Sequence, residues 1–326
     1  MNNVHCTPEM KKYIEEIDLI VFDIDGVLIN TMQSFIATIV ITTQYYINII
    51  LRIDVDLNHL SEADAMKFKE FTGFNNDWDL TEGMILYQLF LYKSGLTNFR
   101  LPDFLKQVDE AGGGLGGINA VVKNYCNTET ITWLKDKVKS YLIRKTFQEF
   151  YGGEEYCKSL YGFTPQSYKG KGSVESEIIL LDTALIRGWN GAIGILTGRT
   201  KEETEFALKK LQLIDPAQRD RNLVQYNDDI LPDKPHPEKI VRILNNADSN
   251  AAIYIGDSID DYLTVFNYNQ RGLKRQLKFG LVAAKGIPLS GIPNDAKNFM
   301  SESVNPLIEF IINNNKRVTA NPESEN

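Results

Sequence analysis

The sequence predicts an α/β protein in which a Rossmann-like parallel sheet core carries an inserted α-helical domain. From about residue 178 onward, short apolar runs alternate with amphipathic stretches, which is typical of parallel strands with helices packed on them. A similar apolar run at residues 17–22 lies far upstream. The long stretch between these two parts has mostly helical periodicity, so we expect it to be an insertion into the core.

The size and charge of the chain limit the classes of function. With 326 residues, it is long enough for two domains or for one domain with an insertion. It is 43% hydrophobic and 24% charged, as in an ordinary soluble globular protein. The net charge of -8 argues against a nucleic-acid partner, which requires a basic surface. An acidic protein that acts on a phosphate ester must supply a metal ion or a well-placed lysine or arginine.

Three cysteines, Cys6, Cys126 and Cys157, are far apart and form no Cys-x-x-Cys pair. They indicate neither a disulfide framework nor a zinc site, and we expect a reducing, cytoplasmic compartment. The first residues lack the pattern of a secretory signal. The most apolar segment, 35–53, is interrupted by polar residues and falls short of the ~20 apolar residues of a membrane span. We therefore expect a buried helix there and no membrane contact.

The same patterns divide the chain. Residues 1–16 are a polar, helical lead-in; 17–30 and 178–314 form the core domain; 31–177 form the helical domain; and 315–326 have the composition of a disordered tail. In the core, strands are predicted at 17–23, 191–196, 223–226, 251–255 and 279–282, with helices at 201–213 and 237–245.

In the insertion, helices are predicted at 31–51, 61–72, 80–94, 103–110, 129–150 and 154–161. Two segments interrupt them, 73–78 and the glycine run Gly112–Gly117. The glycine run follows no strand and precedes no Lys-Ser/Thr pair, so we predict a mobile loop between helices and not a phosphate-binding loop.

Two aspartates directly follow the first predicted strand. Asp23 and Asp25 are two residues apart, so in an extended chain both side chains point to the same side, just beyond the strand's carboxyl end. Open α/β sheets bind their ligands at this edge. Two carboxylates suit a hard divalent cation, and one of them can also act as nucleophile or proton donor. The alternative is an ordinary turn with solvated aspartates.

Two further segments could bind phosphate. Thr197 offers a hydroxyl and Gly198 a backbone N–H after an apolar strand, although most such turns are only helix caps. Lys234 lies between aspartate and proline just before a helix, where a fixed lysine could neutralise charge on a phosphoryl group. The alternative is a surface lysine at a helix start.

A fourth segment places more carboxylates after the predicted strand 251–255. Asp257 lies in the turn, where it could reach the same metal as Asp23, and Asp261 follows one helical turn later. A plain serine cap with solvated aspartates is the alternative. The four segments all follow strands, in an order that builds one crevice, and their coincidence favours a site.

These segments are DIDGVL at 23–28, LTGR at 196–199, DKPHP at 233–237 and GDSIDD at 256–261. As an ordered set they resemble the four motifs of the haloacid dehalogenase superfamily. The position of the insertion, after the first motif, is similar to that in subfamily IA, which carries a helical cap there. The resemblance implies that Asp23 is the nucleophile that forms an aspartyl-phosphate and that Asp25 is the general acid and base.

The resemblance also assigns the remaining motif residues. Thr197 and Lys234 match the second-motif hydroxyl and the third-motif lysine of the catalytic set. Asp257 matches the acid that completes a Mg²⁺ site with Asp23 and the backbone carbonyl of Asp25. Asp261 matches a second acid of the fourth motif, which is a metal ligand in some members and a supporting residue in others.

Asp25 distinguishes between reactions within the superfamily. Dehalogenating members lack an acid at this position because halide leaves without a proton, whereas the leaving alcohol of a phosphate ester needs one. We therefore expect a magnesium-dependent phosphatase of a small phosphorylated metabolite. A sugar-phosphate mutase is the alternative enzyme. A non-catalytic binding module on the same fold is disfavoured, because such a module has no chemical need for the complete set of five motif residues.

The insertion is where we expect substrate selection, since cap loops that meet the active site exclude water and choose the leaving group. Its segments 73–80, 161–163 and 168–172 resemble a little-characterised phosphatase subgroup. We nominate Asn75, Asn76, Asp77 and Trp78 as a substrate-facing loop. A polar loop with Trp78 packed between helices is the alternative. The substrate and the oligomeric state, for which a homodimer is one option, stay open.

Overall fold

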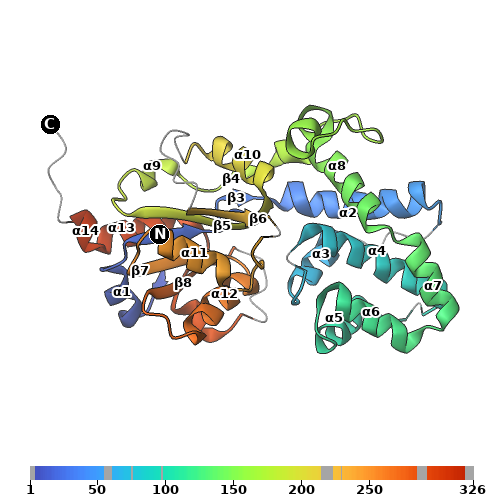
Figure 1. Cartoon of the computed structure of the whole chain (residues 1–326), viewed down its shortest axis with the longest axis horizontal. Helices are drawn as coiled ribbons and strands as arrows, with labels where there is room; N and C mark the ends of the chain where they lie inside the picture. The colour runs from blue at the N-terminus through green and yellow to red at the C-terminus, as the bar shows by residue number, and fades with distance from the viewer. Residues whose placement is uncertain are drawn as a thin grey trace. The chain divides into compact units, whose positions relative to one another are not determined.

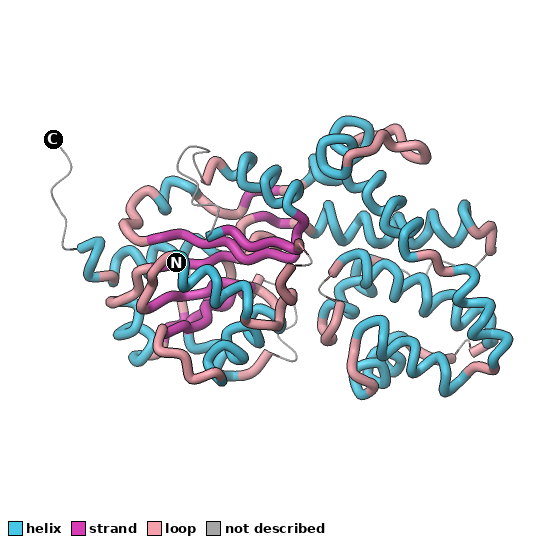
Figure 2. Tube along the Cα trace, in the orientation of Figure 1, coloured by secondary structure: helices cyan, strands magenta, loops and turns pink. Residues whose placement is uncertain are grey.

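The computed structural model describes residues 4–54, 61–74, 76–96, 98–213, 223–228, 230–284 and 292–319. The chain forms two compact units, one of Met1–Asn30 with Ile178–Asn326 and the other of Thr31–Glu177. The strands of the main sheet all lie in the first unit, and helices dominate the second (Figures 1 and 2). We call the first the core unit and the second the helical unit.

The core unit is built on a seven-stranded sheet in the order β1-β9-β8-β7-β2-β5-β6. Its strands are β1 His5–Cys6, β2 Leu19–Phe22, β5 Ala192–Thr200, β6 Val224–Asn227, β7 Ala251–Gly256, β8 Gln276–Val282 and β9 Phe299–Ser301. All neighbours are parallel except β1 and β9. The chain fills one side of β2 with β5 and β6 and then crosses to β7 on the other side, which makes β2 the switch point where such sheets bind ligands.

Both faces of this sheet are covered. Along β2, Leu19 and Val21 pack into one hydrophobic cluster and Ile20 and Phe22 into the other. The cluster that contains Ile20 also includes residues of helices α1 Pro8–Ile14, α10 Lys201–Leu211 and α13 Val304–Asn314. The cluster that contains Leu19 includes residues of helices α11 Glu238–Asn246 and α12 Ile259–Gln270. Strands buried on both faces read as continuous apolar runs, which is why the sequence reveals them. The predicted fold class is thus confirmed.

The helical unit is joined to the core unit through a short antiparallel ribbon. Strand β3, Ile29–Asn30, pairs with β4, Ile178–Ile179, at the two points where the chain leaves and re-enters the core unit. The remaining core elements are α9 Thr183–Ile186, η6 Asn294–Asn298 and α14 Lys316–Thr319.

The structure differs from the prediction at both ends of the core. The lead-in 1–16 contains strand β1, and Met10 and Ile14 of α1 are part of the hydrophobic core. Asn315, expected to open a disordered tail, is fully buried. Its Nδ2 donates to the carbonyl oxygens of Ile14 at 2.8 Å and Ile17 at 2.9 Å, so it ties the end of α13 to the start of the chain. Residues 320–326 of the predicted tail lie outside the described residues.

Every regular element described between residues 31 and 177 is a helix. These are η1 Met32–Ile36, α2 Ala37–Tyr45, η2 Tyr46–Ile50, α3 Glu62–Lys69, α4 Asp77–Ser94, α5 Leu101–Glu110, α6 Gly114–Tyr125, α7 Thr128–Lys137, α8 Ser140–Tyr161 and η4 Ser173–Ser176. Among the helices that the structure describes, none combines the length and apolarity needed to cross a bilayer.

The glycine run corrects one prediction. Residues Gly112–Gly117 are not a loop throughout, because α6 begins at Gly114. A Cβ on Gly117 would lie 2.4 Å from the carbonyl oxygen of Val108, and one on Gly113 would lie 2.6 Å from that of Thr72. Close backbone packing therefore requires glycine here and outweighs its low helix propensity.

Three helix predictions in the insertion were also wrong. The helix expected over 129–150 is divided between α7 and α8, and the helix expected over 154–161 is the end of α8, which continues through a kink at Gly153 with φ 60°. Helix α4 begins at Asp77 and not at residue 80.

Candidate active site

Asp23 follows β2 at the carboxyl edge of the sheet and is 5% exposed. Its Oδ1 accepts a hydrogen bond from the backbone N of Ile24 at 2.7 Å, and its Oδ2 accepts one from Lys234 Nζ at 2.9 Å. Burial raises the pKa of Asp23 to about 7; Lys234 acts to lower it, and the nearby carboxylates Asp261 and Asp25 act to raise it. The carboxylate thus lies in a buried, strongly charged environment.

Lys234 is the cation of this site. Its Nζ also donates to Asp261 Oδ1 at 2.7 Å, and the three side chains are 4% exposed for Lys234, 7% for Asp23 and 0% for Asp261. Burial lowers the pKa of Lys234, but the charges of Asp23 and Asp261 outweigh burial and raise it. The lysine is therefore held charged between two carboxylates.

Both oxygens of Asp261 are engaged inside the protein. Oδ1 accepts from Lys234 and from the hydroxyl of Tyr254 at 2.6 Å. Oδ2 accepts from Ser258 Oγ at 2.7 Å and from the backbone N of Asp257 at 3.2 Å. It also accepts from the backbone N of Ser258 at 3.1 Å, as part of the capping box that starts α12. Burial raises the pKa of Asp261, but Lys234 and these donors outweigh burial and lower it. Asp261 thus orients Lys234 and fixes the turn that carries Asp257.

A candidate cation site lies between Asp23, Asp257 and Asp261. Asp23, Asp257 and Asp261 each offer an oxygen, and these oxygens all lie within 4.8 Å of one another. Gly26 makes room for this arrangement: it has φ 73°, and a Cβ at this position would lie 1.8 Å from Asp257 Oδ2. The first and fourth motifs therefore meet because residue 26 has no side chain.

We expect Gly26→Ala to weaken magnesium binding at least about tenfold, because the methyl group would displace Asp257. The positive φ should also cost about 1–2 kcal/mol of folding free energy. Gly272→Ala is a matched control, since Gly272 has φ 62° but open space around its Cβ position. Calorimetric titration with Mg²⁺ and urea unfolding separate the two effects. Equal magnesium affinity in both variants would contradict the role of Gly26.

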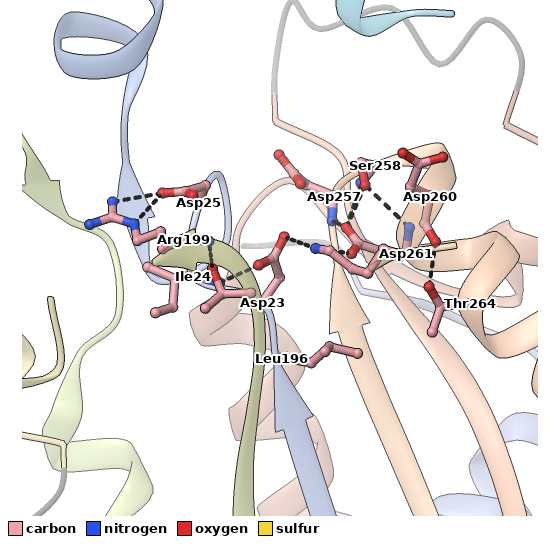
Figure 3. A network of polar contacts seen from close by, with 12 residues as sticks. Asp23, Ile24, Asp25, Leu196, Arg199, Asp257, Ser258, Asp260, Asp261 and Thr264 are labelled. Atoms are coloured by element: carbon pink, nitrogen blue, oxygen red, sulfur yellow. Dashed lines mark hydrogen bonds and ion pairs between the residues drawn. The ribbon is translucent and has the colours of Figure 1, made fainter. Parts of the chain in front are cut away.

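Asp25 does not share the surroundings of Asp23. Its Oδ1 accepts from Arg199 Nε at 2.9 Å and from Nη2 at 2.7 Å. In Figure 3, Arg199 and Asp25 lie on one side of Asp23, and Asp257 and Asp261 lie on the other. Strand β2 ends at Phe22, and the chain bends at Ile24 and turns from Gly26. The two aspartates therefore do not lie on one extended strand, which the prediction of side chains on the same side assumed.

Thr197 and Gly198 lie within the last residues of β5, which continues to Thr200 beyond its predicted end. The Thr197 side chain is buried, and its Oγ1 accepts from the backbone N of Arg199 at 3.3 Å. Gly198 is exposed, with no atom within 4 Å of its Cβ position. This edge therefore offers a hydroxyl and an open stretch of backbone.

The residues nominated in the insertion have structural partners within the helical unit. Asn76 caps α4: its Oδ1 accepts from the backbone N of Trp78 at 2.9 Å. Asp77 forms an ion pair with Lys69 at 2.9 Å, and Arg144 lies 3.5 Å from the centre of the Trp78 ring. Asn75 lies outside the described residues. A substrate-facing role for this segment stays a prediction.

Three residues of the site were not identified from the sequence: Arg199, Gly26 and Tyr254. Arg199 directly follows Thr197-Gly198 and lies within β5, which extends to Thr200. Because charged residues are rarely buried without a partner, an arginine in a buried strand can signal an ion pair. Gly26 follows Asp25 in a turn, where a glycine can signal a positive φ. Tyr254 reads only as a strand residue.

Comparisons with known proteins bear on the fold of this chain and on one matched segment. Residues 186–269 match the model of the family described as haloacid dehalogenase-like hydrolase. A phosphatase from Thermococcus thioreducens has 20% identity and a TM-score of 0.57, over 90% of this chain and 99% of that one. A candidate phosphoglycolate phosphatase from Lactobacillus delbrueckii subsp. bulgaricus has 14% identity and a TM-score of 0.50, over 91% of this chain and 98% of that one.

At these identities the two solved structures show a shared fold. No match to a curated protein was found. The family model covers a segment from α9 to α12, including the second, third and fourth motifs, and the first motif lies on the adjacent central strand. The segment 186–269 is thus similar to the haloacid dehalogenase-like hydrolases, and the chain as a whole shares the fold of the two solved structures.

Proposed function

We propose that this protein is a magnesium-dependent phosphatase that hydrolyses a small phosphorylated metabolite through a phosphoryl group on Asp23. The observation that carries the proposal is the separation of two carboxylates at one strand end. Asp23 lies buried beside Lys234, where it can act on phosphorus, and Asp25 is held apart by Arg199, where it can exchange protons. A phosphoryl transfer that ends in hydrolysis requires both roles.

The residues fit a bound Mg²⁺. The donors are hard carboxylate oxygens, and three carboxylates with one lysine leave the site negative. We propose that Asp23, Asp257 and the backbone carbonyl of Asp25 hold the ion. Asp261 lies in the same cluster, but its contacts suit it better to orienting Lys234. A bound Mg²⁺ supplies positive charge that stabilises phosphoryl oxygens.

In the proposed first step, the Asp23 carboxylate attacks phosphorus in line with the leaving oxygen. The bond from phosphorus to that oxygen breaks as Asp25 donates a proton to it. Lys234 stabilises charge on the phosphoryl oxygens, and Thr197 and Gly198 donate hydrogen bonds to them. In the second step Asp25 takes a proton from water, which attacks phosphorus, and the bond to Asp23 breaks to release inorganic phosphate.

A phosphate-release screen over a panel of phosphorylated metabolites tests this function. With Mg²⁺ we expect release from at least one ester, and a chelator should reduce it to the level of an Asp23→Asn blank until Mg²⁺ is restored. Conversion of a hexose 1-phosphate to its 6-phosphate without free phosphate would indicate a mutase instead. Equal release with and without divalent ion would refute the metal dependence.

A further inference from the structure

We propose that Arg199 is a positioning residue for proton transfer, which holds Asp25 ready to protonate the leaving group. This inference rests on the proposed phosphatase function. Arg199 donates from Nε and Nη2 to the same oxygen, Asp25 Oδ1, at 2.9 and 2.7 Å. Charge-assisted bonds of this kind fix orientation as well as adding energy. The contact joins the first motif to the second, across two neighbouring strands (Figure 3).

The burial of the pair is asymmetric. The Arg199 side chain is 1% exposed, whereas that of Asp25 is 28% exposed. A guanidinium stays charged in proteins, so a buried Arg199 needs a carboxylate partner and holds it firmly. In the part of the chain that the structure describes, no group donates to the other oxygen, Asp25 Oδ2. One oxygen of Asp25 is therefore anchored, and the other is available to exchange a proton with substrate or water.

The backbone of Arg199 contributes separately. Its N–H donates to Thr197 Oγ1 at 3.3 Å, so the hydroxyl proton of Thr197 can point to a phosphoryl oxygen. A side-chain substitution at residue 199 leaves this backbone bond in place. The effect of such a substitution on proton transfer can therefore be measured with the phosphate contacts retained.

The distinguishing measurement is the dependence of kcat/KM on the leaving group, which reports the first step. The leaving group of 4-nitrophenyl phosphate departs without a proton, whereas that of phenyl phosphate depends more on protonation. For Arg199→Met we expect kcat/KM to fall about 10²-fold or more with phenyl phosphate and less than about tenfold with 4-nitrophenyl phosphate. Arg199→Lys keeps one charged donor and should restore part of the loss.

A double variant tests whether Arg199 acts through Asp25. In an Asp25→Asn background, Arg199→Met should cause no further selective loss with phenyl phosphate, because two residues that act as one unit are not additive. Arg275→Met is the matched control, because it removes an arginine that is paired with Asp248 at 2.9 Å. Asp248 precedes β7 and Arg275 precedes β8, so this pair lies at the amino ends of the strands, opposite the edge that carries the site. The control variant should leave both rates unchanged. If Arg199→Met does not fold, the Arg199→Lys variant and its Asp25→Asn double carry the test.

Equal losses with both esters would overturn the positioning role, as would a further selective loss in the Asp25→Asn background. These outcomes are distinct from failure of the proposed function. If the parent protein hydrolyses neither ester nor any of the metabolite panel, the phosphatase proposal fails, and the inference fails with it. If the parent is active and Asp23→Asn is not, equal losses for Arg199→Met refute the role of Arg199 alone.

Discussion

Replacing Asp23 with asparagine should lower phosphate release at least about 10⁴-fold, because it removes the proposed nucleophile. The fold should persist, because Lys234 keeps Asp261 as a partner at 2.7 Å. The measurement is single-turnover phosphate release on parent and variant, with circular dichroism and a thermal melt to verify folding. A phosphoryl group trapped on the parent by acid quench should be absent from the variant.

Asp18→Asn is the matched control for this experiment. Asp18 is at the other end of β2, where it accepts from the backbone N of Asn250 at 3.0 Å. This variant removes a carboxylate that directly precedes the same strand, away from the site, and its turnover should equal that of the parent. A folded Asp23→Asn protein with the parent's rate would overturn the proposed mechanism.

The largest loss of stability should follow Lys234→Met. This substitution leaves the carboxylates of Asp23 and Asp261 buried, at 7% and 0% exposure, without their shared cation. Removing one partner of a buried ion pair costs about 3–5 kcal/mol. We expect a fall of this size in the free energy of unfolding, measured with urea in the presence of a chelator so that no metal ion replaces the lysine.

A second buried lysine provides the comparison. The side chain of Lys239 is buried as well, with 2% exposed, and its Nζ donates to the Tyr226 carbonyl oxygen at 2.8 Å and to the Asp233 carboxylate. Its two carboxylate partners, Asp233 and the more distant Asp228 at 3.7 Å, are 48% and 18% exposed, so water can reach both when the lysine is lost. Lys239→Met should therefore cost less, about 1–3 kcal/mol. Equal or reversed losses would show that the charges of Asp23 and Asp261 do not depend on Lys234.

The strands and motifs of the core could be predicted from the sequence because short, continuous segments of the chain determine them. Each parallel strand is buried on both faces and reads as an apolar run, and each motif follows such a run. The positions of Asp23, Thr197, Lys234 and Asp257 at one edge of the sheet follow from this topology. The direction of the Asp25 side chain does not, since it depends on an arginine 174 residues later in the chain.

The helical unit was harder to predict because tertiary contacts decide its boundaries. No proline or glycine marks the break between Lys137 and Ser140, and the glycines that start α6 are typical of loops. The contacts that overrule their propensity are with Thr72 and Val108, which lie in other segments. Likewise, nothing near Asn315 reveals that its amide bonds to carbonyl groups 301 and 298 residues away.

The ribbon of β3 and β4 has a consequence for how this protein can diverge. Because Ile29 pairs with Ile179 and Asn30 with Ile178, the insertion begins and ends at adjacent points. The whole insertion is thus one long connection between the two strands of the ribbon. Connections whose ends lie close together tolerate insertions and replacements well. The helices of this connection can therefore be lengthened, shortened or replaced while the pairing of β3 with β4 keeps the two ends of the insertion in register.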